Sequence, residues 1–431
     1  MTALGDGQTA WAPDRALELV ALGIFVLALA HTFAAKQLER LCNRYPRHAG
    51  LFHLLGEIEV VFGFWAIVLV LAMVAMAGGA RALEYAESRN YTEPLFVFVV
   101  MVMAASRPIL ATVVGAVDRL ARVLPVATPV ATAWLCLAGI PLLGSLVTEP
   151  AAMTIAALMM APSVFAPHIP ERAKYLALGV LFVNVSIGGT LTSYAAPPVL
   201  MVATTWQWDS AWMASHFGWK AAIAALANAT FATFVLRKHL RAEVPAPAAA
   251  IGDAKVPILV ALVHLALLAG VVLLVHHPIG FLGLFLMFLG YTRAYERHQS
   301  PLILREALLV AFFLAGLVLL GSMQRWWLQP IVSGLEPLAL FFGALGLTAI
   351  TDNAALTYLG SLVVGMSEPS KYMLVAGAVA GGGLTVVANA PNPAGIALLK
   401  RGFADGSIGA GSLFIGAALP TAVAAAAFLL L

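Results

Sequence analysis

Two short segments in different halves of the chain each place a single acidic residue in an otherwise apolar stretch. They read Thr148-Glu149-Pro150-Ala151-Ala152-Met153-Thr154 and Thr351-Asp352-Asn353-Ala354-Ala355-Leu356-Thr357. We expect Glu149 and Asp352 to bind a cation, because carboxylates persist in apolar segments where they face a cavity and bind a ligand. Asn353 adds an amide oxygen, and Thr148 and Thr351 add hydroxyls. The alternative is a structural role, in which each carboxylate caps a helix N-terminus and is stabilised by the helix dipole.

Each acidic segment is followed by a Lys-Tyr pair and then by a glycine-rich stretch that ends in prolines. The pairs are Lys174-Tyr175 and Lys371-Tyr372, and the stretches run 188–198 and 381–391. A helix can unwind at glycines, here Gly188, Gly189, Gly381, Gly382 and Gly383. Freed carbonyls and nearby side-chain oxygens can then coordinate a hard cation; the candidates are Asn184, Thr190, Thr192, Ser193, Thr385 and Asn389. The alternative is that these small residues serve only close helix packing.

The composition places these acids in a membrane. Hydrophobic residues make up 61% of the chain and charged residues only 10%, whereas a soluble domain carries roughly 25% charged residues. The two cysteines, Cys42 and Cys136, form no metal or disulfide motif. The net charge of +3 is modest, so we expect no nucleic-acid partner. The chain lacks a phosphate loop, a Ser/His/Asp order and a Cys/His metal spacing, so we expect it not to be an enzyme.

Apolar runs of about 20 residues predict membrane-spanning helices. We place them near 16–35, 51–77, 95–117, 216–236, 256–275, 279–292, 304–322 and 408–430. The zones 127–205 and 335–401 differ, because in each the acidic segment lies between two apolar runs and a helix interrupted by glycines follows. We interpret each zone as a re-entrant helical hairpin with the acid at its tip, followed by a broken helix. Such backbone is tolerated only where protein or a wet cavity shields it from lipid.

The loop charges predict the topology. Basic residues gather near 36–47, 119–122 and 237–255, which the positive-inside rule places in the cytoplasm. Each half then has three helices, a re-entrant hairpin, a broken helix and a final helix, and it crosses the membrane an odd number of times. We therefore predict an all-α polytopic membrane protein with an inverted repeat: 1–240 form the first repeat, 241–255 a cytoplasmic linker and 256–431 the second repeat. In that geometry, substrate and coupling ions bind where the repeats meet.

One further acid is a candidate for proton transfer. His53 and Glu57 are spaced to share a helix face, so Glu57 could face the cavity and relay protons, as could Glu59. The alternative is that these side chains snorkel to the interface near the cytoplasmic end of their helix.

These motifs resemble those of the ion transporter superfamily. The tip Thr351-Asp352-Asn353 and the glycine-rich run that ends in Asn389-Ala390-Pro391-Asn392-Pro393 resemble the "putative Na+/H+ antiporter" branch in particular. The resemblance covers about 50–400 and implies a homodimer that works by an elevator-like motion. Dicarboxylate carriers of the superfamily are marked by Ser-Asn-Thr at both tips. This chain lacks that signature, which argues against a dicarboxylate substrate.

We therefore predict a secondary active membrane transporter, a Na+(Li+)/H+ antiporter that binds Na+ or another monovalent cation at Glu149 and Asp352 and uses no cofactor. Its expected partners are the inorganic cation, the proton, membrane lipid and a second copy of the chain. Its expected location is the bacterial inner (plasma) membrane, as an integral multi-pass protein. Two alternatives stay open. One is a cation-coupled anion carrier for arsenite or an organic acid, held at hairpin helix N-termini. The other is a membrane scaffold that transports nothing.

Overall fold

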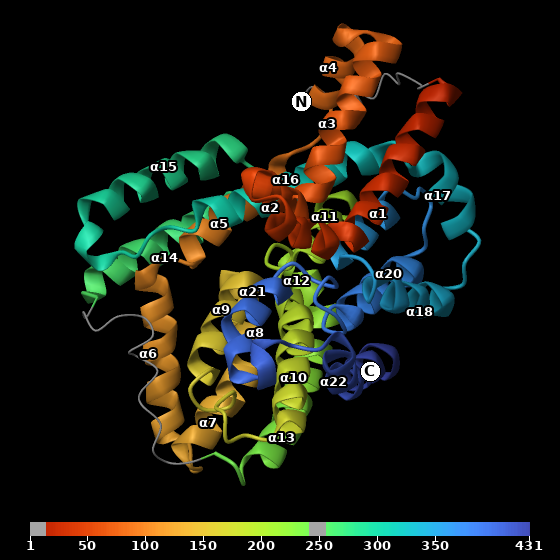
Figure 1. Ribbon diagram of the computed structural model, residues 1–431. Helices are drawn as coiled ribbons and strands as arrows, with labels where there is room; N and C mark the ends of the chain where they lie inside the picture. Colours follow the sequence, from red (N-terminus) through yellow and green to blue (C-terminus); the bar gives the residue numbers. More distant parts are fainter. Residues whose placement is uncertain (1–13, 241–255) are drawn as a thin grey trace. The chain divides into compact units, whose positions relative to one another are not determined.

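The computed structural model describes residues 14–240 and 256–431, and these residues form helices and connecting loops without any strand (Figure 1). Within this described part, seven helices are long and apolar enough to span a membrane, or up to eight with one bent pair counted as a single span. The predicted all-α polytopic membrane architecture is confirmed. The proposed linker 241–255 lies outside the described residues.

The chain divides into two compact units. The first holds the described residues up to Asn90 together with Phe312–Leu328, and the second holds Tyr91–Ala311 and Gln329–Leu431 apart from 241–255. The helices of the first unit are α1 (Arg15–Arg44), α2 (Ala49–Gly56), α3 (Ile58–Ala77), α4 (Gly79–Glu87) and most of α16 (Leu304–Ser322).

Helices α3 and α16 cross in direct backbone contact. A Cβ on Gly316 would strike the backbone of Phe62 and Gly63, and Tyr85 donates a hydrogen bond to the carbonyl of Leu319 at 2.6 Å.

The predicted continuous helix over 51–77 is wrong. Glu57 has extended backbone (φ −77°, ψ 119°) and separates α2 from α3.

The second unit contains most of the helices and every candidate residue of the acidic segments. Its helices are α5 (Thr92–Ala104), α6 (Arg107–Val123), α7 (Thr128–Trp134), α8 (Ile140–Val147), α9 (Glu149–Met160), α10 (Glu171–Gly188), α11 (Pro197–Trp206), α12 (Ser210–Met213), α13 (Trp219–Leu236), α14 (Ile258–Leu273), α15 (Pro278–Ala294), part of α17 (Arg325–Val332), α18 (Pro337–Thr348), α19 (Asn353–Ser361), α20 (Glu368–Gly381), α21 (Asn392–Leu399) and α22 (Ala410–Leu430). The predicted helix over 95–117 is wrong as a single rod, because α5 and α6 are bent by 63°. The chain leaves helical geometry at Ser106, which has extended backbone (φ −67°, ψ 143°), and Pro108 lies in the first turn of α6, where its missing N–H costs no helical hydrogen bond.

At both predicted hairpins two helices are joined at the acidic segment, and both predicted breaks are present; that the hairpins are re-entrant stays a prediction. Only Thr148 separates α8 from α9, and a Cβ on Gly144 would lie 3.1 Å from that of Ala152, so the two arms pack closely. Residues 349–352 join α18 to α19. The first broken helix consists of α10 and α11, and the second consists of α20 and α21. The two hairpins differ in length: α7 and α8, continuous through a π-turn, cover a spanning length, whereas α18 has 12 residues. The inversion of one half relative to the other stays a prediction.

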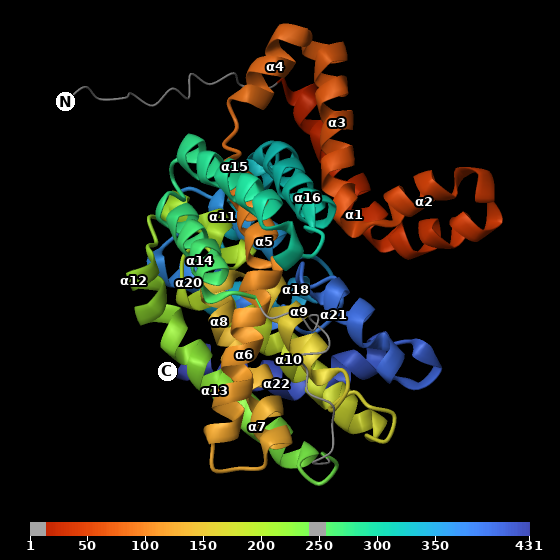
Figure 2. The ribbon, with the colours of Figure 1, turned by 90° about the vertical axis from the view of Figure 1, so that its left-hand side faces the viewer.

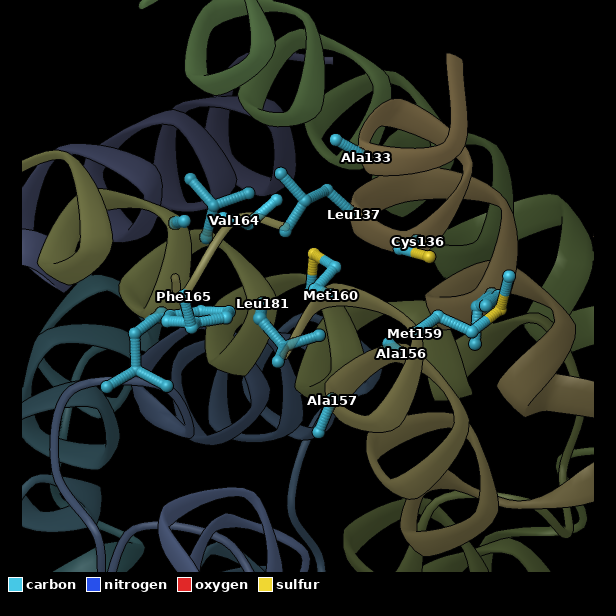
Figure 3. Close-up of a cluster of buried hydrophobic side chains, with 14 of the residues drawn as sticks. Ala133, Cys136, Leu137, Ala156, Ala157, Met159, Met160, Val164, Phe165 and Leu181 are labelled. Atoms are coloured by element: carbon cyan, nitrogen blue, oxygen red, sulfur yellow. The ribbon is translucent and has the colours of Figure 1, made fainter. Parts of the chain in front are cut away.

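A large apolar cluster fixes the first hairpin against the first broken helix. Figure 3 shows Cys136 and Leu137 from the first arm packed beside Met160, which ends α9, and Leu181 of α10. Helix α10 also packs along α13 and α22, and both ribbon views show it alongside α13 (Figures 1 and 2). The tip of the first hairpin therefore sits on a rigid support.

Candidate functional site

Glu149 is the first residue of α9, and its side chain is fully buried. One carboxylate oxygen, Oε2, accepts a hydrogen bond from Nδ2 of Asn389 at 2.8 Å. The other, Oε1, has no hydrogen-bond partner among the described residues. Because burying an uncompensated carboxylate is expensive, the group needs a compensating cation or proton. This makes Glu149 the residue around which the site is built.

Gly189, at the first helix break, lies directly against this carboxylate. A Cβ on Gly189 would come within 2.5 Å of Oε1 of Glu149. Thr148, one residue before the acid, is 5% exposed and has φ 126°, which is a strained conformation for a β-branched residue. Its hydroxyl also has no partner in the described chain. The turn at the tip therefore presents a second unpaired oxygen next to the acid.

Three buried asparagines lie at the second hairpin tip and the second helix break: Asn353 begins α19, Asn389 lies in the break and Asn392 begins α21. Their side-chain Oδ1 atoms have no hydrogen-bond donor among the described residues. The Asn353 backbone amide donates to the carbonyl of Ala388 at 3.1 Å. The Nδ2 of Asn392 donates to the carbonyls of Gly382 and Thr385, each at 2.8 Å. These bonds hold the amides in place and leave acceptor oxygens, which are the ligands that hard cations take.

Asp352 has a different environment from Glu149. It is half-buried, and its Oδ1 accepts from the backbone amides of Ala354 at 2.8 Å and Ala355 at 3.2 Å. Asp352 is therefore the N-cap of α19, a role that its carboxylate performs well. The next residue, Asn353, bonds the carbonyl of Ala388, which precedes the Asn389 that bonds Glu149. Thr351, beside Asp352, is half-buried.

The two acids do not occupy equivalent positions, although they align in the sequence. Thr148 is the N-cap residue of α9 and Asp352 is the N-cap residue of α19. Glu149 and Asn353 are therefore the first residues of their helices, and both are fully buried. The structural counterpart of Glu149 in the second half is the neutral Asn353.

The surrounding contacts repeat in the same register. Gly382 lies against Asn353, where a Cβ would be 2.9 Å from Nδ2, as Gly189 lies against Glu149. Likewise, Thr192 donates to the carbonyl of Ser145 at 2.7 Å and Thr385 to that of Ala349 at 2.8 Å. An internal repeat is thus visible in the contacts as well as in the sequence.

The family comparison agrees with this geometry. The family described as "Putative Na+/H+ antiporter" matches residues 16–431. The chain belongs to this transporter family. It is an integral, multi-pass membrane transporter. No curated protein matches it. Among solved structures, the transporter is similar to the crystal structure of the Alcanivorax borkumensis YdaH transporter, with 14% identity, a TM-score of 0.42, and coverage of 86% of this chain and 96% of that chain.

The five glycines at the transporter's helix breaks were expected to let the backbone unwind, but the structure gives another reason for their presence. Gly188, Gly189 and Gly382 have helical backbone angles, with φ between −62° and −70°, and none of the five has positive φ. A Cβ would instead collide with a neighbour at every one of them, for example with the carbonyl of Pro141 at Gly188. Close approach of the hairpin arm therefore requires glycine, and the break and the packing interpretations hold together.

Some predicted ligands of the transporter are used in structure and lie away from the acid's open oxygen. The Asn184 amide donates to the carbonyls of Leu137 at 2.7 Å and Ala225 at 3.0 Å, and its Oδ1 accepts from Asn228 at 3.0 Å. Thr190 donates to the carbonyl of Ile187 at 2.6 Å, and Ser193 bonds Ser210 at 3.2 Å. Asn184 and Ser193 thus link separate segments, and Thr190 bonds the last turn of its own helix; their part in cation binding stays a prediction.

Glu57 lies in the other compact unit, 3.3 Å from Nδ1 of His53. Its proposed part in proton relay stays a prediction.

Three residues of the site were missed by sequence reasoning. Asn392 offers an unpaired amide oxygen, and Ser186 accepts from Asn353 at 3.4 Å while it donates to the carbonyl of Val379. Ser145 donates to the carbonyl of Gly188 at 2.6 Å and accepts from the amide of Leu191 at 2.9 Å, which replaces helical bonds lost at the break. The position of Asn392 between two prolines was the available signal.

Proposed function

We propose that this transporter is a Na+(Li+)/H+ antiporter in which the cation and the proton compete for Glu149. The observation that carries the proposal is the single unpaired oxygen of this fully buried carboxylate, together with the unpaired amide oxygen of its partner Asn389. A desolvated Na+ or Li+ satisfies such acceptors, and so does a proton on the carboxylate. Both cannot do so at once, and this exclusion couples inward proton movement to cation export.

The charge of the proposed site favours a monovalent cation. Glu149 contributes one negative charge, and the asparagine oxygens of residues 353, 389 and 392 contribute none. Asp352 adds a negative charge nearby, but its Oδ1 is taken by two backbone amides of α19. Divalent-cation sites in proteins usually combine several carboxylates. We therefore expect Na+ and Li+ to be preferred over Ca2+.

The same arrangement argues against the anion-carrier alternative. An oxyanion would bind at the N-termini of the hairpin helices α9 and α19, where backbone amides and the helix dipole attract negative charge. Glu149 and Asp352 already place carboxylates there. A second anion would be repelled at both tips.

Flux measurements in proteoliposomes test the proposal. The purified transporter is reconstituted with an internal pH indicator and an imposed pH gradient, and Na+, Li+, K+ and Ca2+ are added in turn. Na+ or Li+ should dissipate the gradient with saturable kinetics, and Ca2+ should not. Uptake of a labelled oxyanion without ion-dependent proton movement would establish the anion carrier instead. Neither flux in correctly folded protein would leave the scaffold alternative.

The homodimer, the elevator-like motion and the bacterial inner membrane belong to the same proposal. Chemical cross-linking in native membranes tests the dimer: as the monomer band disappears with increasing cross-linker, a band of dimer mass should replace it.

A further inference from the structure

A second repeated motif is not explained by the cation site. It is the sequence Glu-x-x-Lys-Tyr, which begins both broken helices: Glu171 to Tyr175 opens α10 and Glu368 to Tyr372 opens α20. In each copy the lysine pairs with the glutamate three residues before it. The two copies differ in what else the lysine contacts.

Lys174 is buried, with 3% of its side chain exposed, and it reaches across to the other half of the chain. Its Nζ donates to the carbonyl of Gly402 at 2.6 Å as well as to Oε1 of Glu171 at 3.0 Å. The same Glu171 oxygen accepts from the backbone amide of Ala404 at 3.3 Å. The hydroxyl of Tyr175 accepts from the backbone amide of Gly409 at 3.0 Å. The motif of α10 therefore holds the segment 402–409, which follows α21.

Lys371 makes no such bond. Its Nζ contacts Glu368 and lies 5.8 Å from the ring centre of Trp206, which ends α11. The side chain is 18% exposed. Each lysine thus lies near the end of the other half's broken helix: Lys174 near the end of α21 and Lys371 near the end of α11. Of the two, only Lys174 donates a hydrogen bond there, to the carbonyl of Gly402. A buried lysine is costly unless fully hydrogen-bonded, so the carbonyl of Gly402 is a necessary partner rather than an incidental one.

The helix that Lys174 anchors is the one that carries the asparagine oxygens of the site. Helix α21 starts at Asn392, three residues after Asn389, and ends just before the 400–402 turn. It is held along its length by the first half: a Cβ on Gly395 would lie 2.8 Å from Sδ of Met153 in α9, and one on Gly402 would strike the carbonyl of Phe165. Because α21 is short and packs against the first half, anchoring its C-terminal end also limits movement of its N-terminal end, where Asn392 lies.

We propose that Lys174 is a positioning residue for cation binding: by anchoring the end of α21, it sets Asn389 and Asn392 against Glu149. This inference rests on the proposed cation site. It assigns to one copy of the repeated Lys-Tyr pair a task that the other copy does not perform.

The test compares Lys174→Met with Lys371→Met. Methionine keeps the apolar stem and removes the ammonium. Glu171, the partner that is left, is 41% exposed and can be solvated, whereas the carbonyl of Gly402 loses its donor, so some loss of stability is expected. Na+-dependent proton flux is measured across Na+ concentrations, together with the thermal unfolding of the detergent-solubilised protein with and without Na+. In Lys174→Met the half-saturating Na+ concentration should rise roughly tenfold, which is the smallest loss of affinity usually seen when a residue that supports a metal ligand is removed. The maximal rate should change less. The Na+-induced rise in unfolding temperature should shrink in parallel. Lys371→Met should leave both quantities unchanged.

The outcomes separate this inference from the proposed function. Absence of Na+-dependent flux and of Na+ stabilisation in the unaltered transporter would overturn both. Normal flux in the unaltered protein with unchanged half-saturation in Lys174→Met, or an equal rise in Lys371→Met, would overturn only the positioning role. Glu171→Ala covers the case in which Lys174→Met does not fold, because Glu171 is half-exposed and its oxygen bonds both Lys174 and Ala404. It should raise half-saturation in the same direction, and an unchanged value would count against the proposal.

Discussion

Replacing Glu149 by glutamine removes the charge of the proposed site and keeps its shape. The hydrogen bond from Asn389 at 2.8 Å can still form to the amide oxygen, so the loss there is about 1 kcal/mol, the difference between a charged and a neutral acceptor. The larger loss is the attraction for the cation. Two unit charges about 4 Å apart interact by about 4 kcal/mol at an effective dielectric constant of 20. At 1.4 kcal/mol per factor of ten, affinity for Na+ should fall roughly a thousandfold.

Folding should survive this change, because a charged side chain at membrane depth costs about 2.5–3.5 kcal/mol on insertion scales and the variant no longer carries it. The assay is Na+-dependent dissipation of a pH gradient in proteoliposomes at several pH values. In the unaltered transporter, lowering the pH should raise the half-saturating Na+ concentration, because protons compete for the same carboxylate. In Glu149→Gln the flux should be lost, with the protein still monodisperse in detergent.

Asp352→Asn is the matched control, because asparagine caps a helix as well as aspartate does. It removes a charge while the bonds to Ala354 and Ala355 can be kept, so affinity should fall by less than about tenfold and the pH dependence should shift rather than vanish. A Glu149→Gln protein with unaltered Na+ saturation and pH profile would refute the reasoning, since the carboxylate would then be structural. Equal losses in both variants would refute the unequal roles of the two acids.

Three further predictions address packing and topology. Gly189→Ala should sharply reduce flux with little effect on expression, since its Cβ would displace Oε1 of Glu149, whereas Gly343→Ala meets no atom within 4 Å and should be neutral in the same flux assay. Asn184→Leu should lower the free energy of unfolding by about 1–3 kcal/mol, because its buried carbonyl partners lose their donor; the half-saturating Na+ concentration of the surviving protein should not change. A cysteine introduced at position 253, in a background without the two native cysteines, should be shielded from impermeant thiol reagents in intact cells; ready labelling would contradict the inverted topology.

The sequence predicts the hairpins and the breaks because the residues that mark them are neighbours along the chain. An acid within apolar surroundings marks each tip, and glycines followed by prolines mark each interruption. Helices α10 and α20 end at Gly188 and Gly381, where the pattern places the breaks. What the local pattern could not give was the reason for the glycines, because the colliding atoms come from segments far away in the chain, such as Pro141.

The same limit explains the helices that were predicted wrongly. The run over 51–77 reads as one long apolar segment in spite of His53, Glu57 and Glu59, and the local signal that was missed is Gly56, directly before the interruption at Glu57. The bend before Arg107 had a readable signal in Pro108, which the length of the apolar run outweighed. Asn184 carries the residue type of a ligand, but its amide is committed to Leu137 and Ala225, contacts that appear only in the folded chain.

The one-residue difference between the sequence alignment and the structural register has a consequence for how the two halves share the site. Aligning the acids pairs Glu149 with Asp352, whereas the helix starts pair Glu149 with Asn353. An aspartate can cap a helix from the position before its first turn, and it then leaves the buried first position to its neighbour. The second half therefore presents an amide where the first presents a charge. A site with one charged and one neutral tip can lose its net attraction for a monovalent cation when a single proton arrives, whereas two equivalent buried carboxylates would keep a charge after the first protonation. In the proposed antiport, the repeat supplies the geometry twice, and one proton on Glu149 would remove the charge of the buried tip while Asp352 stays the cap of α19.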